Sequence, residues 1–295
     1  MFCKLSLTYL FIYFSSNFLS ISAFKGDEFS SMCDLLTKND VPYDTLSPTN
    51  VETKRAKHIL TKFPLVIQNA LLSPFIVQNS GYYLEVIGNP EVPNTGAAYG
   101  GVLCNETFLF YRVRFYVNPD PKGRSFHTVD GKGTPITASL IYFNKKYGTY
   151  EEAREHRGGL VVADFPFGFT KYPNPLFFLV RLVLKYIVRK AGTQIPIPGL
   201  LIYAFFDRLP FLFSYNAMLG SYKDLDESGT VTQYQGVINI LSRTIFPISE
   251  AQFLDSFAIM ENSKGGTLNS TQALNPFNNR ELLKVPGIVQ SLTLL

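Results

Sequence analysis

The sequence predicts an α+β domain in which an antiparallel sheet is covered by helices on one face. Strand-like segments dominate the first half of the chain, and helix-like segments with capping signals dominate the second half. No repeat, heptad pattern or long linker divides the chain. We therefore expect a single domain over residues 53–295, preceded by a leader at 1–23 and an irregular N-terminal arm at 24–52.

The leader has the three-part order of a secretory signal peptide. Lys4 precedes an apolar run of about ten residues, and Ser22 and Ala23 offer small side chains for cleavage. That run is too short to cross a bilayer as a helix. We expect a secreted or lumenal protein. The Ala23–Phe24 junction also resembles the signal-to-transit boundary of plastid proteins, so a plastid reached through the secretory route is the alternative.

Cysteines and sequons fit an oxidising compartment. After cleavage the chain keeps Cys33 and Cys104, which predicts one disulfide, with two separate thiols as the alternative. The tripeptides that begin at Asn105 and Asn269 are acceptors for N-glycosylation, so both sites are expected on the surface of a glycoprotein.

The first half of the chain contains the predicted strands. Residues 51–78 come first, with apolar positions at helical spacing, and predict a kinked helix or two short ones. A strand is expected over 82–87. Residues 106–117 then alternate strictly, which places Arg112, Arg114 and Tyr116 on one face of the clearest strand. Segments 126–129 and 134–143 flank a turn and predict a hairpin or a pair of strands.

The second half contains the predicted helices. Thr149 and Glu152 form a capping box for a short helix, and a strand is expected over 160–163. Asn174 and Pro175 begin a helix over 175–190. A second apolar segment, 199–219, is interrupted at Pro210 and is interpreted as a core helix. Ser249 and Gln252 cap a last helix that ends near residue 262.

The most unusual stretch is 165–206, which contains no acidic residue. Arg181, Lys185 and Arg189 share one stripe of an otherwise apolar helix, and Lys190 follows them. Such a helix is either buried in the core or lies in a membrane interface with its cations toward anionic headgroups. Because Phe and Tyr are also abundant, the sequence predicts a secreted, membrane-associated protein that binds an apolar small molecule or lipid.

Residues 224–235 resemble the calcium loop of EF-hand proteins. By that resemblance Asp224, Asp226 and Ser228 would be side-chain ligands, and Thr230 would offer its carbonyl. Gln235 replaces the bidentate glutamate of the twelfth position, so only a weak calcium site is implied. An ordinary acidic turn is the alternative.

Catalytic signals are sparse. The only histidines are His58, His127 and His156, and none has the spacing of a zinc motif. His127 and Asp130 are the best acid/base pair for the alternative function, a secreted enzyme that acts on a hydrophobic small molecule in an aromatic pocket. A structural or adhesive surface glycoprotein is the second alternative. A nucleic-acid partner is not expected, because the mild basicity is concentrated on an apolar helix.

Overall fold

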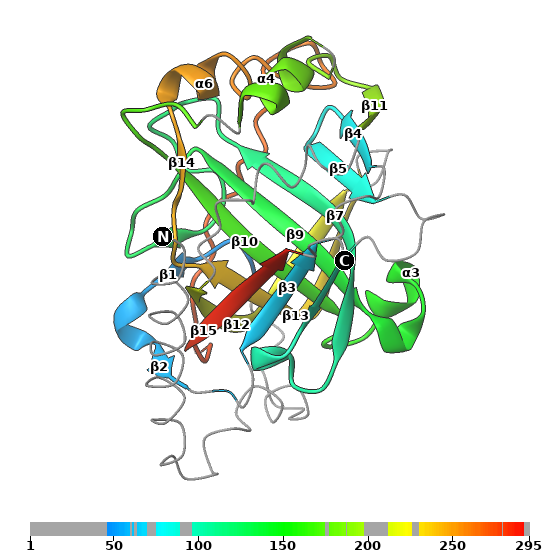
Figure 1. Cartoon of the computed structure of the whole chain (residues 1–295), viewed down its shortest axis with the longest axis vertical. Helices are drawn as coiled ribbons and strands as arrows, with labels where there is room; N and C mark the ends of the chain where they lie inside the picture. The colour runs from blue at the N-terminus through cyan, green and yellow to red at the C-terminus, as the bar shows by residue number, and fades with distance from the viewer. Residues whose placement is uncertain are drawn as a thin grey trace, which may run out of the picture.

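The computed structural model describes residues 46–291, apart from 60, 62–63, 70–74, 89–95, 175–176, 187, 198–211, 226–229 and 279. The leader, most of the arm and Cys33 lie outside these residues. Figure 1 shows a body of long strands with a few short helices at its margins.

The body is a large mixed sheet. Its strands pair in the order β11-β4-β5-β7-β6-β3-β15-β12-β13-β10-β14, while β9 pairs with both β7 and β10 and β2 pairs with β15. The longer strands have the bounds β7 Thr107–Val117, β9 Ile136–Asn144, β10 Leu160–Phe169, β12 Leu212–Leu225, β13 Val231–Ser242 and β15 Leu283–Ser291. The shorter ones are β2 Lys57–His58, β3 Leu65–Asn69, β4 Phe75–Asn79, β5 Leu84–Gly88, β6 Gly96–Tyr99, β11 Thr193–Ile197 and β14 Phe246–Ile248. Strands β1 (Asn50–Val51) and β8 (Thr128–Val129) form a separate parallel pair.

Parallel and antiparallel pairs occur in the same sheet. Strand β10 runs parallel to β13 and β14 and antiparallel to β9. Strand β15 runs parallel to β3 and antiparallel to β12. The prediction of a purely antiparallel sheet is therefore wrong.

The helices in the described part of the chain do not cover the sheet. The described α-helices are α3 Tyr150–Ala153, α4 Phe177–Tyr186 and α6 Glu250–Leu254, with 3-10 turns η3 Thr53–Arg55, η4 Gly101–Leu103 and η5 Lys145–Tyr147. Helices α4 and α6 lie together at one end of the molecule, and α3 lies at its side (Figure 1). The α+β prediction with helices on one face is wrong, because much of the apolar sequence assigned to helices forms strands.

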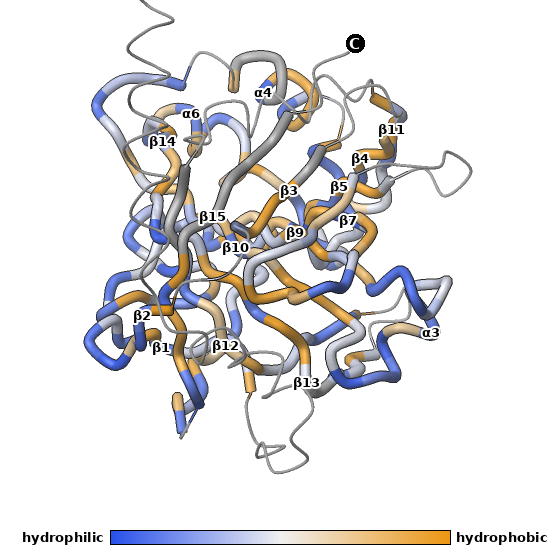
Figure 2. The backbone as a smooth tube through the Cα atoms, turned by 60° about the horizontal axis from the view of Figure 1, so that its bottom comes forward, coloured by the Kyte–Doolittle hydropathy of each residue, from blue (hydrophilic) through white to orange (hydrophobic). Residues whose placement is uncertain are grey.

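The central strands are buried on both faces. Every residue of β9 except Phe143 is buried, and the first six residues of β10 are all buried. One cluster of buried side chains packs on one face, and a second packs beneath α3 around Tyr150, Leu160 and Tyr222. Figure 2 shows hydrophobic residues along the central strands and hydrophilic residues in the loops.

Several local predictions are confirmed and others are wrong. Strand β7 matches the alternating segment, α4 lies within the predicted helix, and Ser249 with Gln252 forms a complete capping box on α6. That helix ends at Leu254, however, and not near residue 262 as predicted. The helix predicted over 51–78 is wrong, because β3 and β4 lie there. The helix predicted over 199–219 is wrong from Leu212 onward, where β12 begins, and its earlier part lies outside the described residues. A short apolar run has no periodicity that separates a buried strand from a buried helix.

No described helix is both long and apolar enough to span a membrane.

Candidate functional site

Four charged side chains meet beneath the surface where β5, β7 and β12 approach one another. Arg114 on β7 is completely buried, and its Nη2 atom lies 2.7 Å from Oε1 of Glu85 on β5 and 3.0 Å from Oδ1 of Asp224 on β12. Nη1 of Arg112 lies 3.1 Å from the same Glu85 oxygen. Tyr150 donates a hydrogen bond of 3.0 Å to Oδ2 of Asp224. We call these five residues the Arg114 network.

Strand pairing assembles this network. Glu85 and Arg114 are direct partners in the antiparallel register of β5 and β7. Residues 112 and 114 are two apart on β7, so both guanidiniums point to the same face. The four charged residues of the network are therefore placed by strands, and Tyr150 on α3 adds the remaining hydrogen bond.

Aromatic rings and further hydrogen bonds complete the surroundings of Arg114. Its guanidinium carbon lies 4.2 Å from the ring centroid of Tyr83 and 5.5 Å from that of Tyr222, within the range of cation–π attraction. Nη1 donates a bond of 3.2 Å to the carbonyl of Lys223. A buried guanidinium is tolerated only when its donors are satisfied, as they are here.

The network has balanced charges, with two guanidiniums against two carboxylates. Burial alone would raise the pKa of Glu85, but the charges of Arg114 and Arg112 outweigh it and lower that pKa to about 2. Glu85 is therefore ionised throughout the physiological pH range and cannot act as a general base near neutral pH. The arrangement is suited to holding strands together.

A second buried cluster joins His127 to Asp164 on β10. Ser139 on β9 donates a hydrogen bond to Oδ1 of Asp164. Nδ1 of His127 lies 3.0 Å from the backbone nitrogen and 3.1 Å from the backbone oxygen of Thr49. Burial raises the pKa of Asp164 to about 7 and lowers the pKa of His127 to about 4. His127 therefore connects the start of the described chain to the sheet interior.

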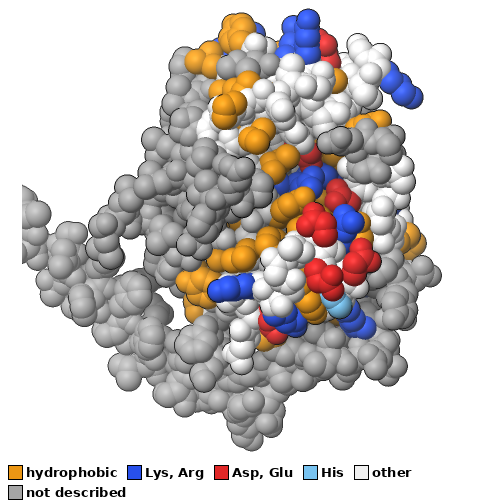
Figure 3. Space-filling model, turned by 90° about the vertical axis from the view of Figure 1, so that its right-hand side faces the viewer, with side chains coloured by type: hydrophobic (Ala, Val, Ile, Leu, Met, Phe, Trp, Pro, Cys, Tyr) orange, Lys and Arg blue, Asp and Glu red, His pale blue; other side chains and the backbone are white. Residues whose placement is uncertain are grey.

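The other two histidines lie on the surface. His58 on β2 is exposed, with Nε2 3.2 Å from Nζ of Lys284. His156 follows α3, where Nε2 lies 3.0 Å from Oε1 of Glu152 and the ring stacks on Tyr147. Figure 3 shows that acidic and basic side chains gather on the side of the molecule that carries α3. The three histidines of the chain are thus held by three different sets of partners.

Comparison with known proteins identifies the family. Residues 42–285 match the family model described as eukaryotic-type carbonic anhydrase. The chain belongs to the eukaryotic-type carbonic anhydrase family. Mouse carbonic anhydrase 6 is 37% identical over 54 residues, which are 18% of this chain and 17% of that protein. Mouse carbonic anhydrase 15 is 23% identical over 121 residues, or 40% of this chain and 37% of that protein. The chain thus spans less than half the length of each of these relatives.

The residues of this family member do not fit a zinc centre of three histidines. Carbonic anhydrases are themselves the standard example of zinc held by three histidines with a metal-bound water as nucleophile. This chain has only three histidines, of which His58 and His156 are exposed and His127 is buried. Within the described ranges, no three His, Cys, Asp or Glu side chains form a group that could hold a metal.

Membership of the carbonic anhydrase family corrects the predicted function and partners. Nε of Arg181 lies 3.0 Å from Oδ2 of Asp255, Lys185 also pairs with Asp255, and Nε of Arg189 lies 3.3 Å from Oε1 of Glu261. These cations therefore face acids that follow α6, and Lys190 is simply exposed. The predictions of a lipid or apolar ligand and of docking on an anionic membrane are wrong. The stretch 165–206 lacks acids, but acids from another segment pack against it.

The predicted acid/base pair is not assembled. His127 is buried against Thr49, whereas Asp130 is exposed and accepts hydrogen bonds of 2.8 and 2.6 Å from the backbone nitrogen and Oγ1 of Thr53. These contacts join the turn that follows β8 to the start of η3. The pair gains no support as a catalytic site.

The predicted calcium loop is only partly described. Both carboxylate oxygens of Asp224 are already bonded, one to Arg114 and one to Tyr150. Asp226 and Ser228 lie outside the described residues, and Thr230 is exposed. The weak calcium site stays a prediction, although its first ligand already has other partners.

Cys104 is disulfide-bonded, as expected of a protein that passes through the secretory route. Its predicted partner, Cys33, lies outside the described residues, so that pairing stays a prediction. Asn105 and Asn269 are both exposed, which leaves their glycosylation a prediction that the structure permits.

Sequence reasoning missed the Arg114 network. The signal was present in the alternating segment, where Arg112 and Arg114 interrupt one face of an otherwise apolar strand. A charge on a buried strand requires an opposite charge nearby. The sequence does not show which residues supply the opposite charges, because Glu85 and Asp224 lie 29 and 110 residues away from Arg114 along the chain.

Proposed function

We propose that this protein is a carbonic anhydrase-family member without zinc-dependent hydratase activity, and that it acts by binding. The observation that carries the proposal is the placement of its histidines. The hydratase mechanism requires three imidazoles on one metal ion with an open position for water. In this chain, His127 contacts Thr49, His58 contacts Lys284 and His156 contacts Glu152.

The interior supports the same proposal. A sheet that encloses a catalytic centre needs polar groups that can receive a substrate or a metal-bound water. In the Arg114 network the polar groups bind one another instead, and Glu85 and Arg114 are both almost fully buried. Such a network maintains the fold, and the carboxylates of Glu85 and Asp224 bind Arg114 and Tyr150 instead of a water molecule or a metal.

The test measures metal content and activity on the same sample. The protein is purified from a eukaryotic secretion host grown with added zinc, analysed by elemental mass spectrometry, and assayed for CO2 hydration by stopped flow. We expect far less than one zinc per chain and a hydration rate equal to that of buffer. A zinc-containing carbonic anhydrase carried through the same purification is the control. One tightly held zinc per chain together with hydration above buffer would overturn the proposal.

We also propose that the mature protein begins near Phe24 and is delivered through the secretory route, with plastid delivery through that route as the alternative destination. The disulfide at Cys104 supports this route. N-terminal sequencing of the secreted protein tests the cleavage site. Intact mass before and after removal of N-glycans tests Asn105 and Asn269. An uncleaved N-terminus and an unchanged mass would contradict the route.

A further inference from the structure

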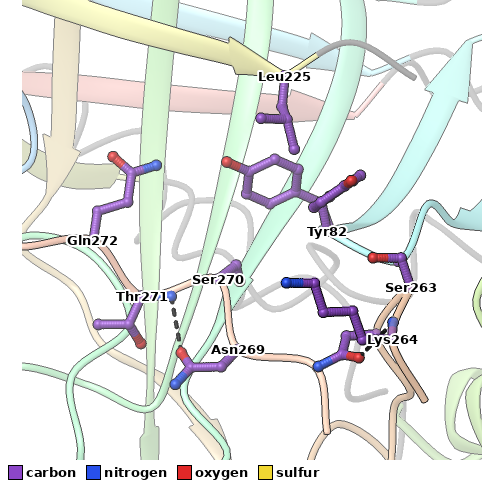
Figure 4. A pocket seen from close by; sticks show the side chains of 11 residues that line it. Tyr82, Leu225, Ser263, Lys264, Asn269, Ser270, Thr271 and Gln272 are labelled. Atoms are coloured by element: carbon purple, nitrogen blue, oxygen red, sulfur yellow. Dashed lines mark hydrogen bonds between the residues drawn. The ribbon is translucent and has the colours of Figure 1, made fainter. Parts of the chain in front are cut away.

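A cavity of about 330 Å³ opens between the β4–β5 turn and the segment that follows α6. Its lining includes Tyr82, Leu225 at the end of β12, Lys264, Asn269 and Thr271 (Figure 4). None of the histidines and no member of the Arg114 network lines it. The cavity lies beside that network, because the Tyr83 ring that lines it also packs on the Arg114 guanidinium.

The two walls of this cavity are fixed by hydrogen bonds. On one side, Gly81 has φ +85° and approaches Ser263 so closely that a Cβ at position 81 would lie 2.9 Å from its backbone nitrogen. Ser263 donates a bond of 3.2 Å to the Gly81 carbonyl. On the other side, Oγ of Ser270 accepts a bond of 2.7 Å from the backbone nitrogen of Val117 on β7. A site with walls held in this way needs little rearrangement to bind a ligand.

Side-chain amides position the polar groups at the rim. Oδ1 of Asn262 accepts bonds of 2.9 Å from the backbone nitrogens of Lys264 and Gly266, which shapes the loop that presents Lys264. Oδ1 of Asn269 accepts a bond of 3.0 Å from the backbone nitrogen of Thr271. In Figure 4 the side chains of Tyr82 and Lys264 extend toward the 269–272 segment from the opposite wall.

The lining has a distinct chemical character. Lys264 is the one charged residue among the described lining residues, and none of them is acidic. Tyr82 and Leu225 add an apolar surface, while Ser263, Asn269 and Thr271 add hydroxyl and amide groups. A lysine presents a single compact positive charge, and this lining supplies no second cation to balance a doubly charged phosphate, so a singly charged carboxylate fits the site better.

We propose that this cavity is a binding site for a small hydroxylated carboxylate of the sugar-acid class. The carboxylate pairs with Lys264, the hydroxyl groups bond with the Ser263 and Thr271 side chains, and the C–H face of the ring packs on Tyr82. The volume lies at the small end of the range for ligand sites, which fits one ring.

The test uses D-glucuronate as the probe, with D-glucose as the neutral ring and acetate as the charge without a ring. Binding is followed by saturation-transfer NMR and calorimetry on the secreted protein, before and after enzymatic trimming of its glycans, because Asn269 lies at the rim. We expect saturable binding of glucuronate that is at least about tenfold tighter than that of either comparison ligand, a difference of about 1.4 kcal/mol.

Variants assign the binding to this cavity. Lys264→Gln should weaken glucuronate binding at least tenfold and Tyr82→Ala should weaken it as well, while Lys264→Arg should retain it. Lys132→Gln, which removes an exposed lysine at the β8 turn, is the matched control and should bind like the wild type. Thermal unfolding of each variant shows whether it is folded. The proposal is overturned if neither glycan form binds glucuronate, if glucose or acetate binds equally well, or if Lys264→Gln binds as tightly as Lys132→Gln. Zinc content does not enter any of these outcomes.

Discussion

Nε2 of His127 lies 3.6 Å from Oδ2 of Asp164, and neither atom has a hydrogen-bond partner within the described part of the chain. Both side chains are almost completely excluded from solvent. An ion pair in such a place is costly, because burial disfavours both charged forms. The pair is therefore expected to be neutral in the weakly acidic range, between the pKa of about 4 for His127 and about 7 for Asp164.

The first prediction concerns stability and pH at Asp164. Its folded pKa is raised above the unfolded value, so folding becomes less favourable as pH rises from about 4 to about 7. Replacing it by Asn removes this effect, and the amide still accepts a bond from Ser139. We expect Asp164→Asn to gain stability relative to wild type as pH rises, by on the order of 4 kcal/mol at pH 7.5 compared with pH 4. Urea unfolding at pH 4, 5.5, 6.5 and 7.5 measures this difference, and a constant difference across these pH values would contradict it.

His127 has the opposite dependence. Its folded pKa is lowered, so stability is lost as pH falls from about 6.5 to about 4, because the unfolded chain takes up a proton that the folded chain does not. Over that window the His127 and Asp164 contributions oppose each other in the wild type. In Asp164→Asn the loss on acidification should appear unopposed. His156→Gln, which replaces an exposed histidine, is the control variant.

The second prediction concerns the Arg114 network. Glu85→Gln removes the carboxylate shared by two buried guanidiniums, so we expect a loss of about 3–5 kcal/mol in the free energy of unfolding. Glu106→Gln is the matched control, because Glu106 pairs with Lys146 at 3.2 Å in an exposed setting, and that pair should contribute less than about 1 kcal/mol. Equal small losses for the two variants would show that the network is not important for stability.

The third prediction concerns metal removal. If no zinc maintains the fold, overnight treatment with a strong chelator should leave the thermal unfolding midpoint unchanged. Differential scanning calorimetry before and after chelation measures this midpoint, and a zinc-containing carbonic anhydrase is run in parallel. A drop in the midpoint that added zinc restores would indicate a metal site that the described residues do not reveal.

The fourth prediction concerns α4. Because Arg181 and Lys185 both pair with Asp255, the protein should not float with liposomes that contain anionic lipid at physiological salt. Asp255→Asn should lower stability only slightly, since these ion pairs are partly exposed. Flotation of the wild type that is lost when Arg181 and Lys185 are neutralised would restore the membrane interpretation.

The fifth prediction concerns the disulfide. Peptide mapping without reduction should recover a linked pair that contains Cys33 and Cys104. In the chain-entropy model, closing a loop of about seventy residues stabilises the fold by about 4 kcal/mol, so Cys33→Ser should lower the unfolding midpoint. Recovery of Cys33 as a free thiol would exclude this pairing.

Local signals in the sequence were sufficient where a structure depends on neighbouring residues. Strict alternation over 106–117 predicted β7, and the Ser249 and Gln252 pair predicted the capped start of α6. Proline and asparagine before α4, and the cations near its end, predicted that helix. In each case the decisive interactions span only a few residues.

Interactions between distant segments decided the rest. The apolar runs that form β3, β4 and β12 look alike as helix or strand until a neighbouring strand satisfies their backbone groups. The same holds for the charged residues. Arg114 is held in the interior by ion pairs with Glu85 and Asp224, and His127 lies between Thr49 and Asp164. The sequence by itself determined the number of histidines and hence the scarcity of metal ligands. Only the tertiary structure decided that each histidine has separate partners, because strand register and burial bring together residues that are far apart along the chain.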